Sequence, residues 1–474
     1  MNNQKIMVLA IAGALTAPGL AMAQSANVSL YGSLDVRWDQ SKYSSATNIG
    51  TNTPNGLTKQ HLSGGTPNYI GFRGSEDLGG GLSAFFQVES QIFTDARPDV
   101  SSQAHTNALF GGRPTYLGLR STSWGELSGG YQDSPYKDVQ KVWNVGVGAG
   151  LGGVLMGNGN STGAVPTPNC VAGFAPGTNV LNATAATATA AASTNCTEAP
   201  GNTTSFNRTM SDSLVFRSNA INGFRVGTMI TMKEFKEGTT QTAVSNTSSN
   251  PGMMALSGTW SGGPFSAAAG YEKHDGFRGA GAAGTTLTGQ NTASTANRMA
   301  KDTGLTLGGK YNFGQGNVAL GYETLSYGNA GTSAADNSFK TKNWVVTADY
   351  AVSAAGRAYA GYAKNNGRTS CGSAFTVAAT TATALATCGS DLGAKQYSFG
   401  YDHSLSKRTK MYAYYANIKN NAAATFGYAS DSRTTNAAST TSGAVLTNGT
   451  GSASSAITAG VSQSSINLGM AHTF

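Results

Sequence analysis

Two short sequences in the chain match catalytic motifs, and neither has the surroundings that its chemistry requires. Residues 159–163 match the G-x-S-x-G motif of serine hydrolases, whose serine needs a strand before it and a helix after it. Residues 148–153 match the G-x-G-x-x-G motif of dinucleotide-binding folds, which needs a βαβ unit. Both lie in a segment rich in glycine, serine and asparagine, and the five histidines show no metal-ligand spacing. The sequence therefore predicts no catalytic residue, no metal site and no cofactor.

Charged side chains on alternating segments indicate a different chemistry, that of an ion path. Fixed positive charge facing an acidic loop across a water-filled channel orders water and biases ion passage, and a guanidinium stays charged at any ordinary pH. The arginines on the polar faces of their segments are Arg37, Arg73, Arg120, Arg217 and Arg225. The candidate carboxylates are Asp35, Glu89, Asp133 and Asp138, the last two at the start of a long loop. A simpler interpretation is also open: the arginines only pair with nearby carboxylates and stiffen the wall.

The end of the chain shows the kind of element that positions these side chains. In residues 465–474 the apolar Ile466, Leu468 and Met470 share one face, and small or polar residues share the other. Such a strand has two different surroundings. In a membrane barrel the apolar face meets lipid and the polar face meets a wet lumen.

The alternation places two further groups of side chains. Arg113 falls on the apolar face of its strand, so we expect it beyond the apolar band or before a change of register. Aromatic residues near strand ends are expected in the two belts at the membrane surfaces. These are Tyr31, Trp38, Tyr350, Tyr401 and Phe474.

Strand candidates alternate with connectors along the whole chain, and the connectors are short and long in turn. The short ones carry the Gly, Ser, Asn and Pro of tight turns, and the long ones include 42–66 and 133–205. The candidate strands are 28–41, 67–74, 82–95, 108–120, 125–132, 206–218, 224–236, 251–260, 265–274, 301–312, 317–327, 340–352, 357–365, 395–403, 410–420 and 461–474. The predicted fold is all-β: a transmembrane antiparallel barrel of about 16 strands, with short periplasmic turns and long external loops.

The start of the chain and its composition support this class. Residues 1–23 contain Lys5, then an apolar run, then an Ala-Met-Ala site, and are predicted to be a cleaved signal peptide. The barrel domain is then 24–474. Charged residues make up 11% of the chain, against about 25% in an ordinary soluble domain. The net charge of +8 is scattered rather than clustered, which favours an anion-attracting pore and disfavours nucleic-acid binding.

Four cysteines form two local pairs, each within one long connector. Cys170 and Cys196 lie in the first, and Cys371 and Cys388 lie in the second. In an exported protein this spacing favours two loop disulfides, and free thiols remain the alternative.

Several stretches resemble the Gram-negative porins of the betaproteobacterial type. The similarity is carried by Asn27-Val28-Ser29-Leu30-Tyr31-Gly32, by Gly74-Ser75-Glu76-Asp77-Leu78-Gly79, by Leu405-Ser406-Lys407-Arg408-Thr409 and by Gly469-Met470-Ala471-His472-Thr473-Phe474. The resemblance spans the mature chain. It implies a homotrimer of barrels, each with its own pore, narrowed by a third loop that folds into the lumen. That loop is 133–205, which is longer than is usual for such porins.

The resemblance also implies partners and a role. Phe474 would end a C-terminal strand that the outer-membrane barrel assembly machinery recognises, and the barrel would contact outer-membrane lipid and lipopolysaccharide. We expect an outer-membrane porin for passive diffusion of small hydrophilic solutes and ions, with a weak preference for anions. Three alternatives are a solute-specific channel, a barrel enzyme and an adhesin. No credible Ser/His/Asp set supports an enzyme, and no passenger domain precedes the strands.

Overall fold

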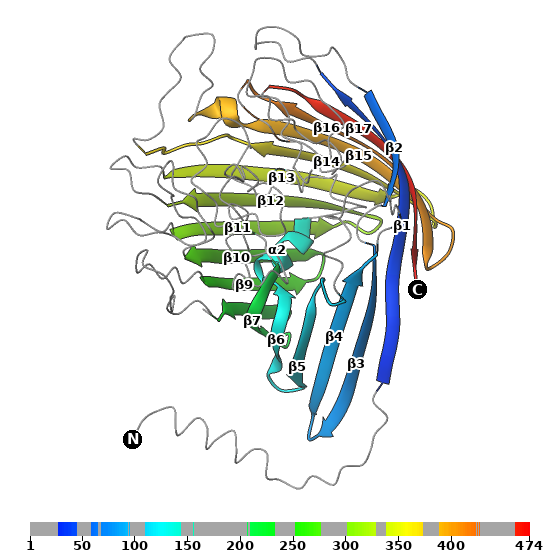
Figure 1. Ribbon diagram of the computed structural model, residues 1–474, viewed down its shortest axis with the longest axis vertical. Helices are drawn as coiled ribbons and strands as arrows, with labels where there is room; N and C mark the ends of the chain where they lie inside the picture. Colours follow the sequence, from blue (N-terminus) through cyan, green and yellow to red (C-terminus); the bar gives the residue numbers. More distant parts are fainter. Residues whose placement is uncertain are drawn as a thin grey trace, which may run out of the picture.

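The computed structural model describes the strands and a few connecting segments. The described residues are 27–44, 58–64, 68–92, 94, 110–143, 155, 206, 209–232, 252–275, 301–328, 338–372, 388–422, 424, 426 and 460–474. Within them the strands form one antiparallel sheet that closes on itself (Figure 1). No helix in this part of the chain is long and apolar enough to cross a membrane.

The elements follow one another around the barrel in chain order. The strands are β1 (Asn27–Tyr43), β2 (Thr58–Gly64), β3 (Tyr69–Gly79), β4 (Leu82–Gln91), β5 (Thr115–Ser121), β6 (Gly125–Asp133), β7 (Thr209–Ser218), β8 (Phe224–Thr231), β9 (Gly252–Gly262), β10 (Phe265–Asp275), β11 (Lys301–Asn312), β12 (Gly316–Tyr327), β13 (Phe339–Ala351), β14 (Gly356–Asn365), β15 (Ala394–Ser404), β16 (Thr409–Asn420) and β17 (Gln463–Thr473). Among the described residues, the connectors contain two short helices, α2 (Tyr136–Trp143) and the 3₁₀ helix η3 (Ser390–Leu392).

The barrel is closed by the two ends of the chain. β1 pairs with β17 from Ser33 opposite Thr473 to Tyr43 opposite Gln463. Figure 1 shows these two strands side by side. The Phe474 N–H also donates to the Gly32 carbonyl at 3.1 Å. Pairing of the first and last strands leaves no open edge, as a sheet in lipid requires.

The second barrel position is made of two segments. β3 pairs with the first half of β1, and β2 pairs with the second half, from Val36 opposite Gly64 to Lys42 opposite Thr58. Seventeen described strand segments therefore fill 16 positions, the predicted number. The prediction that 42–66 is all connector is wrong, because β2 lies within it. Its polar sequence has no apolar alternation, and its ladder to β1 holds it as a strand.

The two faces of the strands have the predicted surroundings. On β17, Ile466, Leu468 and Met470 are 43%, 48% and 51% exposed, whereas the alternating Ser465 and Asn467 are buried. The apolar residues therefore point out of the barrel and the polar residues point in.

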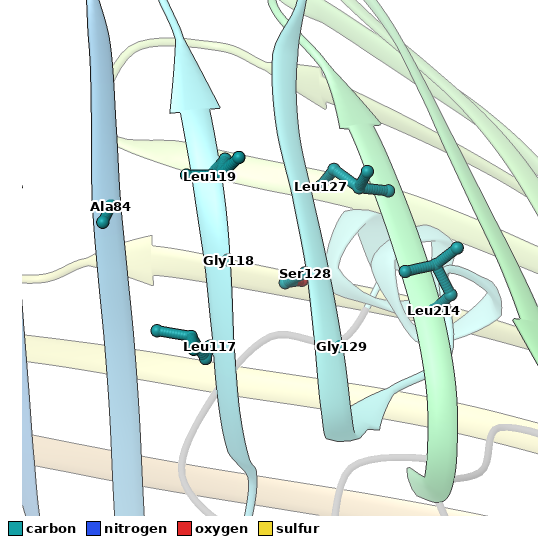
Figure 2. Close-up of a pocket in the computed structure, with 8 residues that line it drawn as sticks. All are labelled: Ala84, Leu117, Gly118, Leu119, Leu127, Ser128, Gly129 and Leu214. Atoms are coloured by element: carbon teal, nitrogen blue, oxygen red, sulfur yellow. The ribbon is translucent and has the colours of Figure 1, made fainter. Parts of the chain in front are cut away.

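The outward face of β4–β7 carries a shallow apolar hollow of about 310 Å³ (Figure 2). It lies between leucines and over small residues, namely Leu117, Leu119, Leu127, Leu214, Ala84 and Gly129.

A disulfide joins two points of the single connector between β14 and β15, as predicted. Cys371 and Cys388 are bonded, with their Cα atoms 6.2 Å apart. Cys170 and Cys196 lie outside the described residues, as do the predicted signal peptide and most of 133–205, so those predictions stand as predictions.

Candidate pore and constriction

The helix α2 lies inside the barrel against the inner face of β9–β13 (Figure 1). Tyr136, Val139 and Trp143 are almost fully buried, and this spacing puts them on one face of the helix. Asp138 in the first turn and Lys141 in the last turn complement the helix dipole. They form an ion pair of 2.6 Å, in which the Lys141 side chain is largely exposed. The start of the long loop thus folds into the lumen, as predicted.

Polar groups of the wall hold the start of α2. The Ser134 hydroxyl donates to a carboxylate oxygen of Glu272 and accepts a hydrogen bond of 3.1 Å from the Tyr136 N–H. The Tyr136 hydroxyl donates to Glu323 Oε2 at 3.2 Å, and Asn343 Nδ2 donates to Glu323 Oε1 at 2.6 Å. Burial, reinforced by the negative charge of Glu323, raises the pKa of Tyr136 well above its usual value. The hydroxyl therefore remains a donor at ordinary pH.

Glycines in the wall let the buried face of α2 approach closely. A Cβ atom on Gly270 would lie 2.8 Å from Val139 Cγ2, and one on Gly321 would lie 2.7 Å from Trp143 Cδ1. Real Cβ atoms do not come so near, so both positions require glycine for this fit. The end of the helix is held by Thr347, whose hydroxyl donates to the Trp143 carbonyl at 2.7 Å.

The two predicted loop carboxylates and one predicted arginine meet at the base of α2. Arg217 Nε donates to Asp138 Oδ2 at 3.1 Å, and its Nη2 donates to the Asp133 carbonyl at 3.0 Å. The Asp133 carboxylate accepts from Lys137 Nζ at 2.6 Å and from the Thr209 hydroxyl. Arg217 thus joins β7 to the loop, which agrees with the simpler interpretation of a stiffening pair.

Two predicted residues of β1 lie at another part of the inner wall, beside the tyrosines of β16. The Tyr412 hydroxyl donates to Asp35 Oδ1 at 2.6 Å. Arg37 Nε lies 2.9 Å from the Asp39 carboxylate, and its Nη1 donates to the Tyr414 hydroxyl at 3.2 Å. The guanidinium is therefore held in one orientation, with 12% of the Arg37 side chain exposed.

Glu89 organises the next stretch of wall. It accepts from the Tyr31 hydroxyl at 2.9 Å and from Arg113 Nε at 3.2 Å. Arg113 also lies 5.0 Å from the centre of the Tyr69 ring. It precedes β5, where the regular alternation begins, which agrees with the expectation that it lies beyond the apolar band or before a change of register. The prediction that Tyr31 belongs to a membrane-surface belt is wrong, because its ring faces the lumen.

The remaining three predicted arginines lie toward the short turns. Arg73 stacks over the Tyr31 ring at 4.8 Å. Arg120 stacks over the Phe85 ring at 4.6 Å and pairs with Glu126 at 3.0 Å. Arg225 is exposed on the lumen face of β8. All three follow the predicted orientation, and all lie on strands that α2 does not cover.

Exposure within the ion pairs follows a consistent rule. In seven of the eight lumen pairs that lysine or arginine forms within the described residues, the cationic side chain is more exposed than its carboxylate. The values for Lys141 and Asp138 are 70% and 19%, and those for Arg357 and Asp349 are 39% and 4%. Lys137 with Asp133 is the exception. Water in the lumen therefore meets mainly positive groups, although the charges are paired.

Sequence reasoning missed several lumen residues. Three tyrosines line the wall with hydroxyls bound to charged groups or stacked on a neighbour: Tyr359, Tyr412 and Tyr414. Lys141 on α2 was also missed. Period-two alternation carried a signal for Tyr359, which shares parity with the buried polar Asn365. It carried none for Tyr412 and Tyr414, which share parity with the buried apolar Ala416 and Ile418. Strand alternation could not indicate the orientation of Lys141, because this residue lies on a helix within a connector.

Comparison with known proteins gives a consistent result. A family model described as Gram-negative porin matches residues 8–423. The major outer membrane protein P.IB of Neisseria meningitidis serogroup B is 32% identical over 132 residues, which are 27% of this chain and 35% of that protein. An outer membrane porin protein of Bordetella pertussis is 39% identical over 88 residues, 18% of this chain and 22% of that protein. The matched stretches thus span about a third or less of these curated relatives.

Solved structures agree on the fold. The anion-selective porin from Comamonas acidovorans superimposes with a TM-score of 0.60 at 19% identity, covering 95% of this chain and all of that one. OmpT of Vibrio cholerae superimposes with a TM-score of 0.52 at 14% identity, covering 95% of this chain and 98% of that one. At sequence identities this low, the superpositions show a shared fold and nothing about function.

Proposed function

The chain belongs to the Gram-negative porin family, and from this premise we propose that it forms a water-filled channel for passive diffusion of small hydrophilic solutes and ions. The family and the named relatives place it in the outer membrane. Its barrel has an apolar exterior and a polar interior, and α2 occupies part of the lumen. These features suit a diffusion channel with a constriction.

The channel prefers anions weakly. The observation that carries this proposal is the exposure rule, since seven of eight lumen pairs turn their cation toward the water. Paired charges still create a local field, and the nearer charge dominates at short range. Lys141 on α2, whose side chain is 70% exposed, is the strongest candidate for this role. Arg37 on the wall is a second candidate because Asp39 and Tyr414 hold its guanidinium in one orientation, although its side chain is only 12% exposed. The printed title of the Comamonas porin describes that protein as anion-selective, which supports the proposal by analogy.

A constriction role for 133–205 follows from the same arrangement. Asp133, Asp138 and Arg217 hold its first turns, and the other predicted pore residues lie on other parts of the wall: Asp35, Arg37, Arg73, Glu89, Arg120 and Arg225. The loop and the wall would together set the width of the pore.

A second candidate, a solute-specific channel, has one observation in its favour. Tyr412 and Tyr414 have ring centres 6.0 Å apart beside Arg37, so a planar solute could stack on a tyrosine near a fixed positive charge. Saturable uptake of one solute into liposomes would favour this candidate over general diffusion. An enzyme or an adhesin has no such observation, and family membership favours a channel.

The proposed assembly is a homotrimer in outer-membrane lipid and lipopolysaccharide. A Vibrio OmpT structure is described as a trimer form, which is a property of that protein. The apolar hollow over Ala84 and Gly129 would suit contact with another barrel, because small residues allow close approach (Figure 2). The strand ending at Phe474 would carry the signal for the barrel assembly machinery.

The test is planar-bilayer recording with purified protein. We expect stepwise conductance and, under a KCl gradient, a reversal potential of the sign that indicates chloride preference. Absence of conductance above bare lipid would refute the channel. A clear cation preference would refute the selectivity proposal alone.

A further inference from the structure

Three lysines face one another on the outside of the barrel. Lys364 on β14 lies directly opposite Lys395 on β15, and Lys395 lies directly opposite Lys419 on β16. Directly opposite residues in antiparallel strands have Cβ atoms about 5 Å apart, and like charges there are destabilising. We call these three residues the lysine row.

The lysine row points outward, away from the lumen. Along β15 and β16 its neighbours Gln396 and Ile418 are almost fully buried and point inward. On the outward face, Phe399 and Tyr415 are 56% and 40% exposed. The row therefore belongs to the lipid-facing surface, where dissolved ions of the pore do not reach it.

The row sits at the level of membrane headgroups. Each lysine is at the end of its strand that is remote from the short turns, the end expected to be extracellular in this architecture. Next to it lies an aromatic belt, in which the ring centres of Trp344 and Tyr362, and of Tyr362 and Tyr397, are 5.0 Å apart. Such belts mark the boundary between apolar core and headgroups.

Carboxylates do not neutralise the row in the described residues. None lies within 4.0 Å of its nitrogen atoms, and the outward faces of β13–β17 carry no acid there. Lys340 and Lys342 on β13 add two more outward-facing charges beside it. Lys273 on β10 shows the contrast, because it also faces outward and pairs with Asp275 at 2.9 Å.

We propose that the lysine row binds the phosphorylated headgroup of a glycolipid of the outer leaflet. A lysine ammonium binds phosphate as a point charge, and a phosphate with more than one negative charge would offset the repulsion along the row. The lipid is favoured over a free anion because the aromatic belt beside the row would contact its acyl chains. This site deepens the lipid contact in the proposed function and does not depend on ion conduction.

The test compares two variants of the full-length protein in detergent. One carries Lys364→Gln, Lys395→Gln and Lys419→Gln, and the matched control carries Lys273→Gln. The probe is bisphosphorylated lipid A, counted on the protein by native mass spectrometry; dephosphorylated lipid A and inorganic phosphate are tested in parallel. We expect the triple variant to bind lipid A roughly a hundredfold more weakly, at about fivefold for each lysine, and the control to bind as the unchanged protein does.

Each outcome decides the proposal. Equal lipid A affinity of the triple variant and the unchanged protein would overturn it. Equal binding of dephosphorylated lipid A, or displacement of lipid A by inorganic phosphate at comparable concentration, would also overturn it. Bilayer conductance of the same samples reports folding and the channel function separately, and we expect the triple variant to conduct normally. A protein that binds lipid A but forms no channel would refute the proposed function and leave this site standing.

Discussion

Replacing Trp143 with alanine should detach the C-terminal end of α2 from the barrel wall and widen the pore. The side chain is 1% exposed and fits against Gly308 and Gly321 of the wall. Truncation of a buried tryptophan costs about 3–5 kcal/mol. Each 1.4 kcal/mol changes an equilibrium constant by a factor of ten. The ratio of α2 packed against the wall to α2 detached from it should therefore fall by roughly two to four orders of magnitude.

The loss should act on the helix and spare the barrel. The strand ladders do not involve Trp143, and its carbonyl can still accept from Thr347 in the alanine variant. The start of α2 keeps the hydrogen bonds of Ser134 and Tyr136, which contribute about 1.5–3 kcal/mol each when one partner is charged. We therefore expect the first turn of α2 to stay bound to the wall while the C-terminal end of the helix moves into the lumen.

Single-channel recording measures this directly. We expect Trp143→Ala to show higher and noisier conductance than the unchanged protein, with the same resistance of the barrel to detergent. Trp124→Ala is the matched control, because Trp124 is 40% exposed, and it should conduct normally. Unchanged conductance and noise in Trp143→Ala would refute the idea that burial of this ring holds the constriction.

Three further changes test other parts of the site. Gly321→Val should also raise conductance and noise, because its side chain would occupy the place of the Trp143 ring; a normal trace would contradict the close fit. Arg37→Gln should reduce chloride preference, seen as a smaller reversal potential under a KCl gradient, and an unchanged potential would remove Arg37 from the selectivity proposal. The pKa of Tyr136 is raised, so its stabilisation of the helix is fully present below its ordinary pKa of 10.0 and is lost as pH rises through the higher value. Conductance should thus become noisier only in strong alkali, and Tyr136→Phe should be noisier already at neutral pH because Glu323 loses a donor.

Some features of the wall could be predicted because they are local. Alternate residues of a strand point to opposite faces, so parity alone oriented Arg37, Arg217 and Arg225 toward the lumen. Parity put Arg113 on an apolar face, so it was expected beyond the apolar band or before a change of register, and it lies before β5 begins. Parity missed β2, whose seven residues have no apolar alternation and are ordered by their ladder to β1.

The partners of the charged residues could not be predicted, because they depend on which strands become neighbours. Arg217 meets Asp138 across 79 positions of sequence, and Tyr412 meets Asp35 across 377. The choice between a free pore charge and a stiffening pair therefore required the folded barrel. Arg217 binds the loop, as the stiffening interpretation expects. The pore-charge interpretation stays a prediction, supported by the greater exposure of most paired cations.

By itself, the sequence determined a closed barrel with an apolar exterior and about sixteen strand positions, because alternation and turn residues act within a few positions. A loop that enters the lumen was implied only by the resemblance to porins. Only the tertiary structure decided where α2 rests, which carboxylate each arginine meets and that three lysines stand opposite one another. Those outcomes depend on strand register and on contacts between distant segments, which closure of the barrel sets and local pattern does not encode.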